Sequence, residues 1–173
     1  MDAATHSTGA GFCIRDYRPD DFEALWRIDQ RCFPHGIAYS QLELSSFITK
    51  RHAITLVAEF QAANTGASGV PTASPAEGIA GFVVAHSIRH KYGRILTLDI
   101  VPEARRFGLG AKLMSLCEDR LRAAGCVEVY LETAVDNEPA LKLYGKLGYH
   151  IVRTLPEYYA SHSLDAFQLV KQL

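Results

Sequence analysis

The sequence lacks the patterns typical of metal-binding, disulfide-bonded, membrane and nucleic-acid-binding proteins. It has four cysteines, none in a CxxC pair or at a zinc-site spacing from a histidine. No apolar run approaches the roughly 20 residues that span a bilayer, and the start, MDAATHSTGAG, has no basic or apolar segment of a signal peptide. A formal net charge of -1 offers no basic stripe for nucleic acid. We therefore expect a cytoplasmic protein with no metal, nucleic-acid or membrane partner.

What the sequence does contain is enough apolar material for one domain. Its 173 residues are 48% hydrophobic, which suits one compact core. We expect a disordered lead-in over residues 1–10 and a single domain over residues 11–173. A stretch at about 61–77, rich in Ala, Ser, Gly, Thr and Pro, predicts a flexible hairpin loop inside that domain.

Apolar periodicity predicts alternating strands and helices. Asp20 with Glu23, and Ser40 with Glu43, have the spacing of a capping box at the start of a helix. The order of predicted elements is β-α-α-β-β-β-α-β-α-β-β, which indicates a mixed α/β sheet. The strands are expected at 11–17, 52–60, 78–87, 94–101, 127–132, 149–154 and 165–173.

The stretch ARRFGLGA, residues 104–111, lies between a predicted strand and a predicted helix. Glycines at a helix start let an anion approach bare backbone N–H groups, and the two arginines add positive charge. The alternative is a strand–helix turn that simply needs glycine. No GxxxxGK[ST] motif is present, and Leu113 occupies the third glycine position of a dinucleotide fingerprint.

The pattern Arg105-x-x-Gly108-x-Gly110 resembles the pyrophosphate-binding motif of the GNAT acetyltransferase superfamily. LETAVDNEPALKLYGKLGY and RTLPEYYASHSLDAFQL resemble the RimI-like subfamily, which acetylates the N-terminal alanine of a ribosomal protein, and RCFPHGIAY resembles its first interhelical loop. The resemblance implies an α/β GNAT fold. In that fold a mixed, mostly antiparallel seven-stranded sheet has splayed central strands and is flanked by four helices.

The resemblance also implies acetyl-CoA as cofactor, with no metal. Its pyrophosphate would lie on the loop formed by Arg105, Arg106, Phe107, Gly108, Leu109, Gly110 and Ala111. Its pantetheine arm would bind the main chain of Leu98, Asp99 and Ile100 and the side chain of Asn137. The backbone N–H of Asp99 or Ile100 would meet the oxyanion.

Two side chains are candidates for proton transfer. Glu132 ends a predicted strand at the position of the family's base, and Asp99 on the preceding strand is the rival. Tyr144 matches the family's acid, because a phenol with a pKa of about 10 stays protonated at neutral pH. An α-amine has a pKa of about 7.7–8.0 and needs only modest help to lose its proton.

The expected acceptor is the N-terminal α-amine of a protein. Tyr158 and Tyr159, in the loop before the last strand, resemble an element that clamps a peptide, and Phe33, Ile37 and Tyr39 would form the opposite wall. A small-molecule amine acetyltransferase, a lysine acetyltransferase and a non-catalytic acyl-CoA sensor remain alternatives. The sequence does not fix the oligomeric state.

Overall fold

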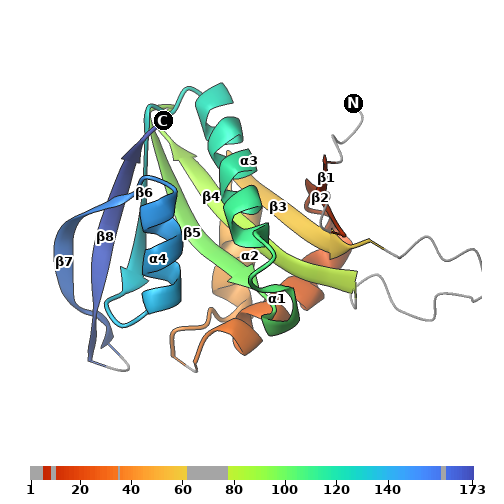
Figure 1. Ribbon diagram of the computed structural model, residues 1–173, viewed down its shortest axis with the longest axis horizontal. Helices are drawn as coiled ribbons and strands as arrows, with labels where there is room; N and C mark the ends of the chain where they lie inside the picture. The colour runs from red at the N-terminus through yellow and green to blue at the C-terminus, as the bar shows by residue number, and fades with distance from the viewer. Residues whose placement is uncertain (1–5, 9–10, 35, 62–77, 161–162) are drawn as a thin grey trace, which may run out of the picture.

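The computed structural model describes most of the chain (Figure 1). Most of the predicted flexible loop at 61–77 and most of the predicted lead-in at 1–10 lie outside the described residues. The described residues are 6–8, 11–34, 36–61, 78–160 and 163–173.

The secondary structure follows the predicted order. The helices are α1 (Phe22–Cys32), α2 (Gln41–Thr49), α3 (Leu109–Ala123) and α4 (Glu138–Lys146), with short 3-10 turns η1 (Pro19–Asp21) and η3 (Pro102–Ala104). The strands are β1 (His6–Thr8), β2 (Phe12–Asp16), β3 (Ala53–Phe60), β4 (Ile79–Ile88), β5 (Tyr92–Ile100), β6 (Glu128–Ala134), β7 (His150–Tyr159) and β8 (Leu164–Gln172).

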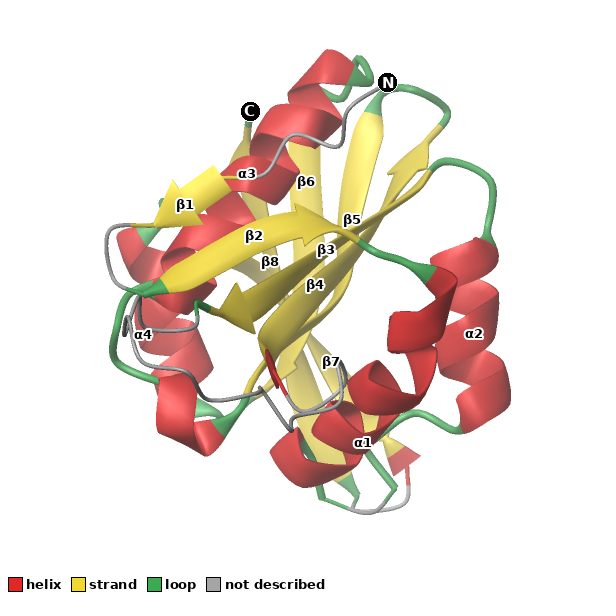
Figure 2. Cartoon of the chain, turned by 90° about the vertical axis from the view of Figure 1, so that its right-hand side faces the viewer, coloured by secondary structure: helices red, strands yellow, loops and turns green. Residues whose placement is uncertain are grey.

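The described strands form one sheet with helices on both faces. Their order is β1-β2-β3-β4-β5-β6-β8-β7, and only the β5–β6 pair is parallel. Helices α1 and α2 cover one face and α3 and α4 the other (Figures 1 and 2). The prediction of a mixed, mostly antiparallel sheet flanked by four helices is confirmed.

The structure adds an eighth strand to the seven predicted. Residues 6–8 lie in the expected disordered lead-in, but they pair antiparallel with β2, where His6 faces Ile14. These three residues therefore belong to the sheet, and the lead-in as a whole stays a prediction. Three residues are too short for an alternation pattern to reveal.

One of the two predicted capping boxes is present. The Ser40 hydroxyl accepts from the Glu43 N–H, and the Glu43 carboxylate accepts from the Ser40 N–H. The box expected at Asp20 and Glu23 is wrong, because α1 begins after Asp21 and Glu23 instead pairs with Arg27.

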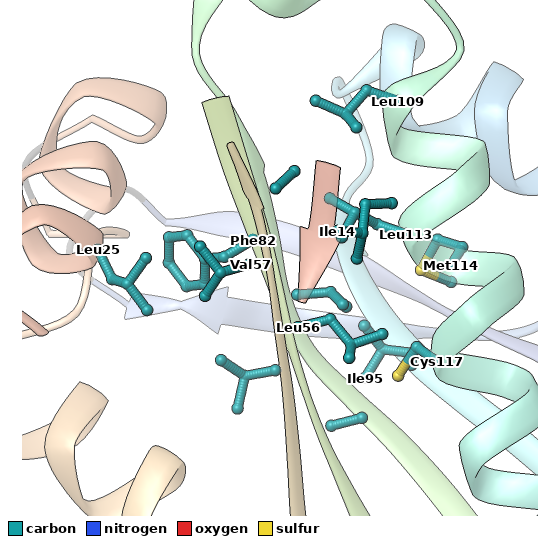
Figure 3. Packing of buried hydrophobic residues seen from close by; sticks show 14 of the residues in the cluster. Ile14, Leu25, Leu56, Val57, Phe82, Ile95, Leu109, Leu113, Met114 and Cys117 are labelled. Carbon is teal, nitrogen blue, oxygen red and sulfur yellow. The ribbon is translucent and has the colours of Figure 1, made fainter. Parts of the chain in front are cut away.

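The core lies on both faces of the sheet (Figure 3). On one face Val57 and Phe82 point toward Leu25 of α1, and on the other Ile95 lies beside Cys117 of α3. All five are buried. The period-2 alternation of the central strands thus supplies two apolar surfaces, each closed by helices.

A buried ion-pair cluster joins strands β2 and β3 to the 3-10 turn η1. The Arg15 guanidinium donates to both Asp21 oxygens at 2.7 and 2.8 Å and also to Glu59. We expect Arg15→Met to lower the free energy of unfolding by about 3–5 kcal/mol, because the Asp21 carboxylate would stay buried without its partner. Urea denaturation measures this.

The matched control is the exposed pair of Arg27 with Glu23, which both lie on α1. Arg27→Met should change the free energy of unfolding by less than about 0.5 kcal/mol, as is usual for exposed helix pairs. Equal losses in the Arg15 and Arg27 variants would contradict a stabilising role for the buried cluster.

Candidate active site

The centre of the sheet opens between β5 and β6. These parallel strands pair at three described positions, the last being Arg94 with Tyr130. Beyond this pair, β5 continues to Ile100 and β6 to Ala134, but no further described residues of the two strands pair with each other. The predicted splay of the central strands is confirmed, and it leaves backbone groups of β5 free to bind a ligand.

The direction of the β5 peptide groups follows from one hydrogen bond. The Val101 N–H donates to the Ala80 carbonyl on β4 at 3.0 Å. Because peptide groups alternate along a strand, the N–H of Asp99 also points toward β4. The N–H groups of Leu98 and Ile100 therefore point into the opening between β5 and β6.

The turn before α3 has the geometry expected of an anion cradle. Gly108 is the N-cap of α3 with a φ of +76°, and a Cβ built there would meet nothing within 4 Å. Arg105 is exposed and donates from Nε to the Ile100 carbonyl at 2.9 Å, while Arg106 is exposed with a φ of +69°. The first N–H groups of α3 face this open space without intrahelical acceptors.

The other residues of the turn differ in how far they are buried and in what they contact. A Cβ on Gly110 would lie 3.2 Å from a methyl group of Leu143, so this glycine also lets α3 approach α4. Leu109 is buried in the core, and Ala111 is half-buried. Phe107 is 61% exposed, and its ring centre lies 6.2 Å from that of Phe12.

Two neighbouring cavities occupy the opening. One, of about 540 Å³, extends toward α2 and the end of β7, and the other, of about 440 Å³, extends toward α4. We call them the outer cavity and the inner cavity. Five residues line both and so mark where the cavities meet: Ile37, Tyr39, Leu96, Glu132 and Tyr159.

Glu132 is fixed at this junction by hydrogen bonds from two strands. Its Oε2 accepts from Arg94 Nε at 3.2 Å and Nη2 at 3.1 Å, and its Oε1 accepts from Gln168 Nε2 at 3.0 Å. Arg94 Nη2 also donates to the Tyr158 hydroxyl at 3.1 Å. The side chain of Glu132 is only 9% exposed, so the carboxylate has a fixed position between the cavities.

Tyr144 lies in the wall of the inner cavity. It is 8% exposed, and its ring centre is 5.7 Å from that of Tyr149. Burial, followed by the nearby Asp99, raises the pKa of Tyr144 well above its ordinary value, so the hydroxyl keeps its proton. Asn137 lines the same cavity and caps α4, where its side chain accepts from the Ala140 N–H at 3.3 Å.

The aromatic residues predicted to bind an acceptor meet around the cavities, with two corrections. Tyr158 and Tyr159 lie at the end of β7 instead of in a loop, because β7 continues past Leu155 through an irregular register. Phe33 lines the inner cavity but not the outer cavity, so it does not form the wall opposite Tyr158 and Tyr159. Tyr39 donates its hydroxyl proton to the Leu96 carbonyl at 3.1 Å.

Asp99, the rival candidate for the base, lies away from both cavities. Its side chain is fully buried and is absent from the lining of either cavity. Its Oδ2 accepts from the Thr97 hydroxyl at 2.9 Å. Burial, followed by the charge of Asp29, raises the pKa of Asp99 well above the ordinary range.

Three features of the site escaped sequence reasoning. Arg94 and Gln168 hold Glu132 from other strands, and Leu96 is the extra residue of a β-bulge in β5, where the pairing with β4 shifts. A cation at the start of the apolar strand RILTLDIV was the available signal for Arg94. Neither the bulge nor Gln168 has a comparable local signal.

The chain matches the model of the acetyltransferase (GNAT) family over residues 22–149. It therefore belongs to this family, as the sequence motifs predicted. In the described part of the chain, no helix is long and apolar enough to cross a membrane. Nor do the described residues include a group of three or more His, Cys, Asp or Glu side chains placed to hold a metal ion.

Relatives and solved structures agree with this assignment. An N-alpha-acetyltransferase of Sulfurisphaera tokodaii is 34% identical over 48% of this chain and 50% of its own, so that match spans about half of the relative. An N-alpha-acetyltransferase of Saccharolobus solfataricus is 26% identical over the full length of both chains.

Two solved structures have a similar fold. Ard1 from Thermoplasma volcanium has a TM-score of 0.78 and 25% identity, over 94% of this chain and 98% of its own. The ribosomal-protein-S18-alanine N-acetyltransferase of Escherichia coli has a TM-score of 0.74 and 20% identity, over 93% of each chain. At that identity the second likeness concerns the fold alone.

Proposed function

We propose that this protein transfers the acetyl group of acetyl-CoA to the N-terminal α-amine of a protein. The observation that carries the proposal is the position of Glu132, fixed where an outer and an inner cavity meet in the opening of the sheet. Such a junction brings two substrates to one carboxylate from opposite sides. The names of the N-alpha-acetyltransferase relatives support the choice of amine.

The coenzyme fits the turn before α3 and the free edge of β5. The first-turn N–H groups of this helix and the open space at Gly108 suit a pyrophosphate, with Arg105 and Arg106 at its rim. The N–H groups of Leu98 and Ile100, which point into the opening, suit the amide-bearing arm. Bound there, the coenzyme supplies an activated acetyl thioester at the inner cavity.

The same strand edge stabilises the charge that develops on the acetyl oxygen. A backbone N–H fixed in a strand needs no reorganisation as that charge forms. Of the two groups that the sequence suggested, the Asp99 N–H points toward β4, so the alternation of β5 favours the Ile100 N–H, with the Leu98 N–H as the second candidate.

Glu132 receives the proton of the attacking amine. Its carboxylate is fixed by Arg94 and Gln168, and both of these partners donate, so the oxygens keep their acceptor role. A proton passed through one water molecule reaches Oε1 or Oε2 from either cavity. An α-amine needs little help here because its pKa is about 7.7–8.0.

Tyr144 returns a proton to the departing coenzyme thiolate. Its raised pKa keeps the hydroxyl protonated at neutral pH, so the proton is available as the carbon–sulfur bond of the thioester breaks and charge develops on the sulfur. Asn137, at the start of the same helix, would bind the pantetheine arm from the facing wall of the inner cavity.

The outer cavity accepts the first residues of an extended peptide. Tyr158 and Tyr159 form one wall, with ring centres 5.1 Å apart, and Ile37 and Tyr39 form the other. The narrow junction favours a small first residue such as alanine or serine. This preference agrees with a RimI-like enzyme, although the acceptor protein need not be ribosomal.

An acetylation assay with paired peptides tests the proposal. We expect rapid acetylation of peptides with a free N-terminal Ala or Ser. N-blocked peptides that contain lysine should react little, because deprotonating lysine, with a pKa of about 10.4, costs roughly 3 kcal/mol more. Mass spectrometry locates the acetyl group.

Variants of the tyrosine wall link the assay to the cavity. Tyr158→Phe or Tyr159→Phe should raise the peptide KM about three- to tenfold, the effect of one lost hydrogen bond. Tyr92→Phe, at the paired end of β5, is the control. Equal rates on free and blocked peptides, or a strong preference for a polyamine or an aminoglycoside, would refute the proposed acceptor.

A further inference from the structure

Arg94 places a positive charge on only one side of Glu132. Its side chain lines the outer cavity, where the acceptor is proposed to bind, and is absent from the lining of the inner cavity. Its Nε and Nη2 atoms bind the same oxygen of Glu132, at 3.2 and 3.1 Å. The described residues that line the inner cavity include no lysine, arginine or histidine. The coenzyme side of Glu132 therefore has no comparable charge.

The guanidinium of Arg94 is held in this position by side chains of β6 and β7. Besides its two bonds to Glu132 on β6, Nη2 donates to the Tyr158 hydroxyl at the end of β7, at 3.1 Å. The group also lies 5.9 Å from the ring centre of Tyr130 on β6. The side chain is 34% exposed, and an arginine keeps its charge at any physiological pH. A fixed positive charge thus forms part of the outer wall.

Glu132 is the ion-pair partner of Arg94, and the other groups that face Arg94 are uncharged at neutral pH. These groups come from four elements: Tyr39 from the α1–α2 loop, His86 from β4, Tyr130 from β6 and Tyr158 from β7. Burial raises the pKa of each tyrosine and lowers the pKa of His86. Glu43 also lines the outer cavity, but its carboxylate is bound by Ser40 at the start of α2. Arg94 and Glu132 thus form a pair without net charge.

A lone carboxylate in the outer cavity would work against the reaction. An α-amine with a pKa of about 7.7–8.0 is mostly an ammonium ion at neutral pH, and only the neutral amine attacks a thioester. A nearby opposite charge favours the charged form of a titratable group, whereas a like charge disfavours it. Glu132 alone would therefore hold its substrate as a protonated ion pair. The positive charge of Arg94, bound to the same carboxylate, opposes this effect.

We propose that Arg94 sets the charge state of the bound acceptor: its charge offsets that of Glu132, so that the outer cavity holds the amine in its neutral, reactive form. This inference rests on the proposed function and deepens it, because it defines the acceptor as a weakly basic amine. Ammonium ions are kept out by the guanidinium. A lysine side chain, whose pKa is about 10.4, is among the amines that this charge disfavours most. Arg94 itself neither takes nor gives a proton.

The pH dependence of kcat tests this role, with a peptide that has a free N-terminal alanine. Arg94→Gln removes the charge and keeps one donor toward Glu132. In the unaltered protein kcat should rise around a midpoint of about pH 8, the ordinary pKa of the amine. In Arg94→Gln the midpoint should lie about one pH unit higher, because Glu132 then favours the ammonium form. At pH 7 kcat and the peptide KM should fall together about tenfold, whereas a merely supporting residue would raise the KM.

Two further variants separate the charge of Arg94 from its support of Glu132. Arg94→Lys keeps the charge and loses the forked contact with the carboxylate, so it should restore the midpoint of kcat even if kcat itself falls. Arg153 is the matched control, because its Nε donates to Gln168 Oε1, and Gln168 Nε2 donates to Glu132. Arg153 lines neither cavity, so Arg153→Gln should leave the midpoint unchanged.

Calorimetry tests the charge preference of the outer cavity without turnover. A peptide that begins with trimethylglycine carries a permanent cation, and its 3,3-dimethylbutanoyl counterpart has the same shape without the charge. The unaltered protein, saturated with coenzyme A, should bind the two peptides with dissociation constants within about threefold of each other. Arg94→Gln should bind the cationic peptide about tenfold more tightly than the neutral one, the same factor as one pH unit in the midpoint of kcat.

Several outcomes would overturn the inference. A midpoint of kcat that is the same in Arg94→Gln and the unaltered protein would do so, as would an equal shift in Arg153→Gln. A tenfold preference of the unaltered protein for the cationic peptide would also contradict it. If Arg94→Gln has no measurable turnover, the calorimetric comparison decides. If the protein acetylates another amine, the proposed acceptor is wrong, and the pH comparison made with that amine still decides the role of Arg94.

Discussion

Glu132→Gln should lower kcat on a peptide acceptor by about 100-fold or more, within the range usual for a lost general base. The amide keeps the size of the carboxylate and can still accept from Arg94, so the fold and the coenzyme affinity should change little. Steady-state kinetics at several pH values measures the effect. The loss should shrink at high pH, where free amine forms without a base.

A matched control is available on the same strand. Glu128 lies on β6 four residues before Glu132, and its carboxylate also accepts from a β8 glutamine, Gln172, at 2.6 Å. Glu128→Gln alters the same chemical group at the paired end of the strand and should leave kcat within twofold. Full activity of Glu132→Gln across the pH range would remove Glu132 from the mechanism.

Tyr144→Phe should also lower kcat by about 100-fold, because the departing thiolate would lose its proton donor. The ring remains to fill its buried place, so thermal stability should be nearly unchanged. The dissociation constant of coenzyme A, measured by titration calorimetry, should stay within threefold. A lower kcat at constant coenzyme affinity separates proton transfer from binding.

The neighbouring tyrosine provides the comparison. Tyr149 packs against Tyr144, but its hydroxyl donates to Glu118 at 2.9 Å, away from both cavities. Tyr149→Phe should lower stability by about 1 kcal/mol through the lost hydrogen bond and leave kcat intact. An unaltered kcat in Tyr144→Phe would defeat the assignment of Tyr144 as the acid.

Local signals predicted the elements that position the site. Gly108 has the left-handed φ that ends a turn and opens α3, and a second glycine, Gly125, follows the last turn of this helix with a φ of +88°. The Ser40 capping box formed as its spacing indicated. In each case the deciding interaction lies within four residues, so the sequence pattern contains it.

Long-range partners could not be predicted in the same way. The bond between Arg94 and Glu132 joins residues 38 positions apart, and it depends on the pairing of β5 with β6, which are separated in sequence by α3. Local patterns also misplaced Tyr158, because Pro156 reads as a loop residue although an edge strand tolerates it. The register of paired strands and the position of a strand at the edge depend on the whole sheet. A short window of sequence therefore does not contain them.

The gap between β5 and β6 also makes the folded state sensitive to the supply of ligand. Unpaired strand edges attract foreign chains when they lie at the rim of a sheet. Here they are enclosed by Ile37 and Tyr39 on one side and by Tyr144 on the other, which leaves room for a thin, amide-bearing molecule. A ligand that completes these edges binds only the native state. At a free concentration 100 times its dissociation constant, this ligand would add about 2.7 kcal/mol to the free energy of unfolding. The abundance of the coenzyme in the cell would then govern how long the protein survives heat and proteolysis, as well as how fast it works.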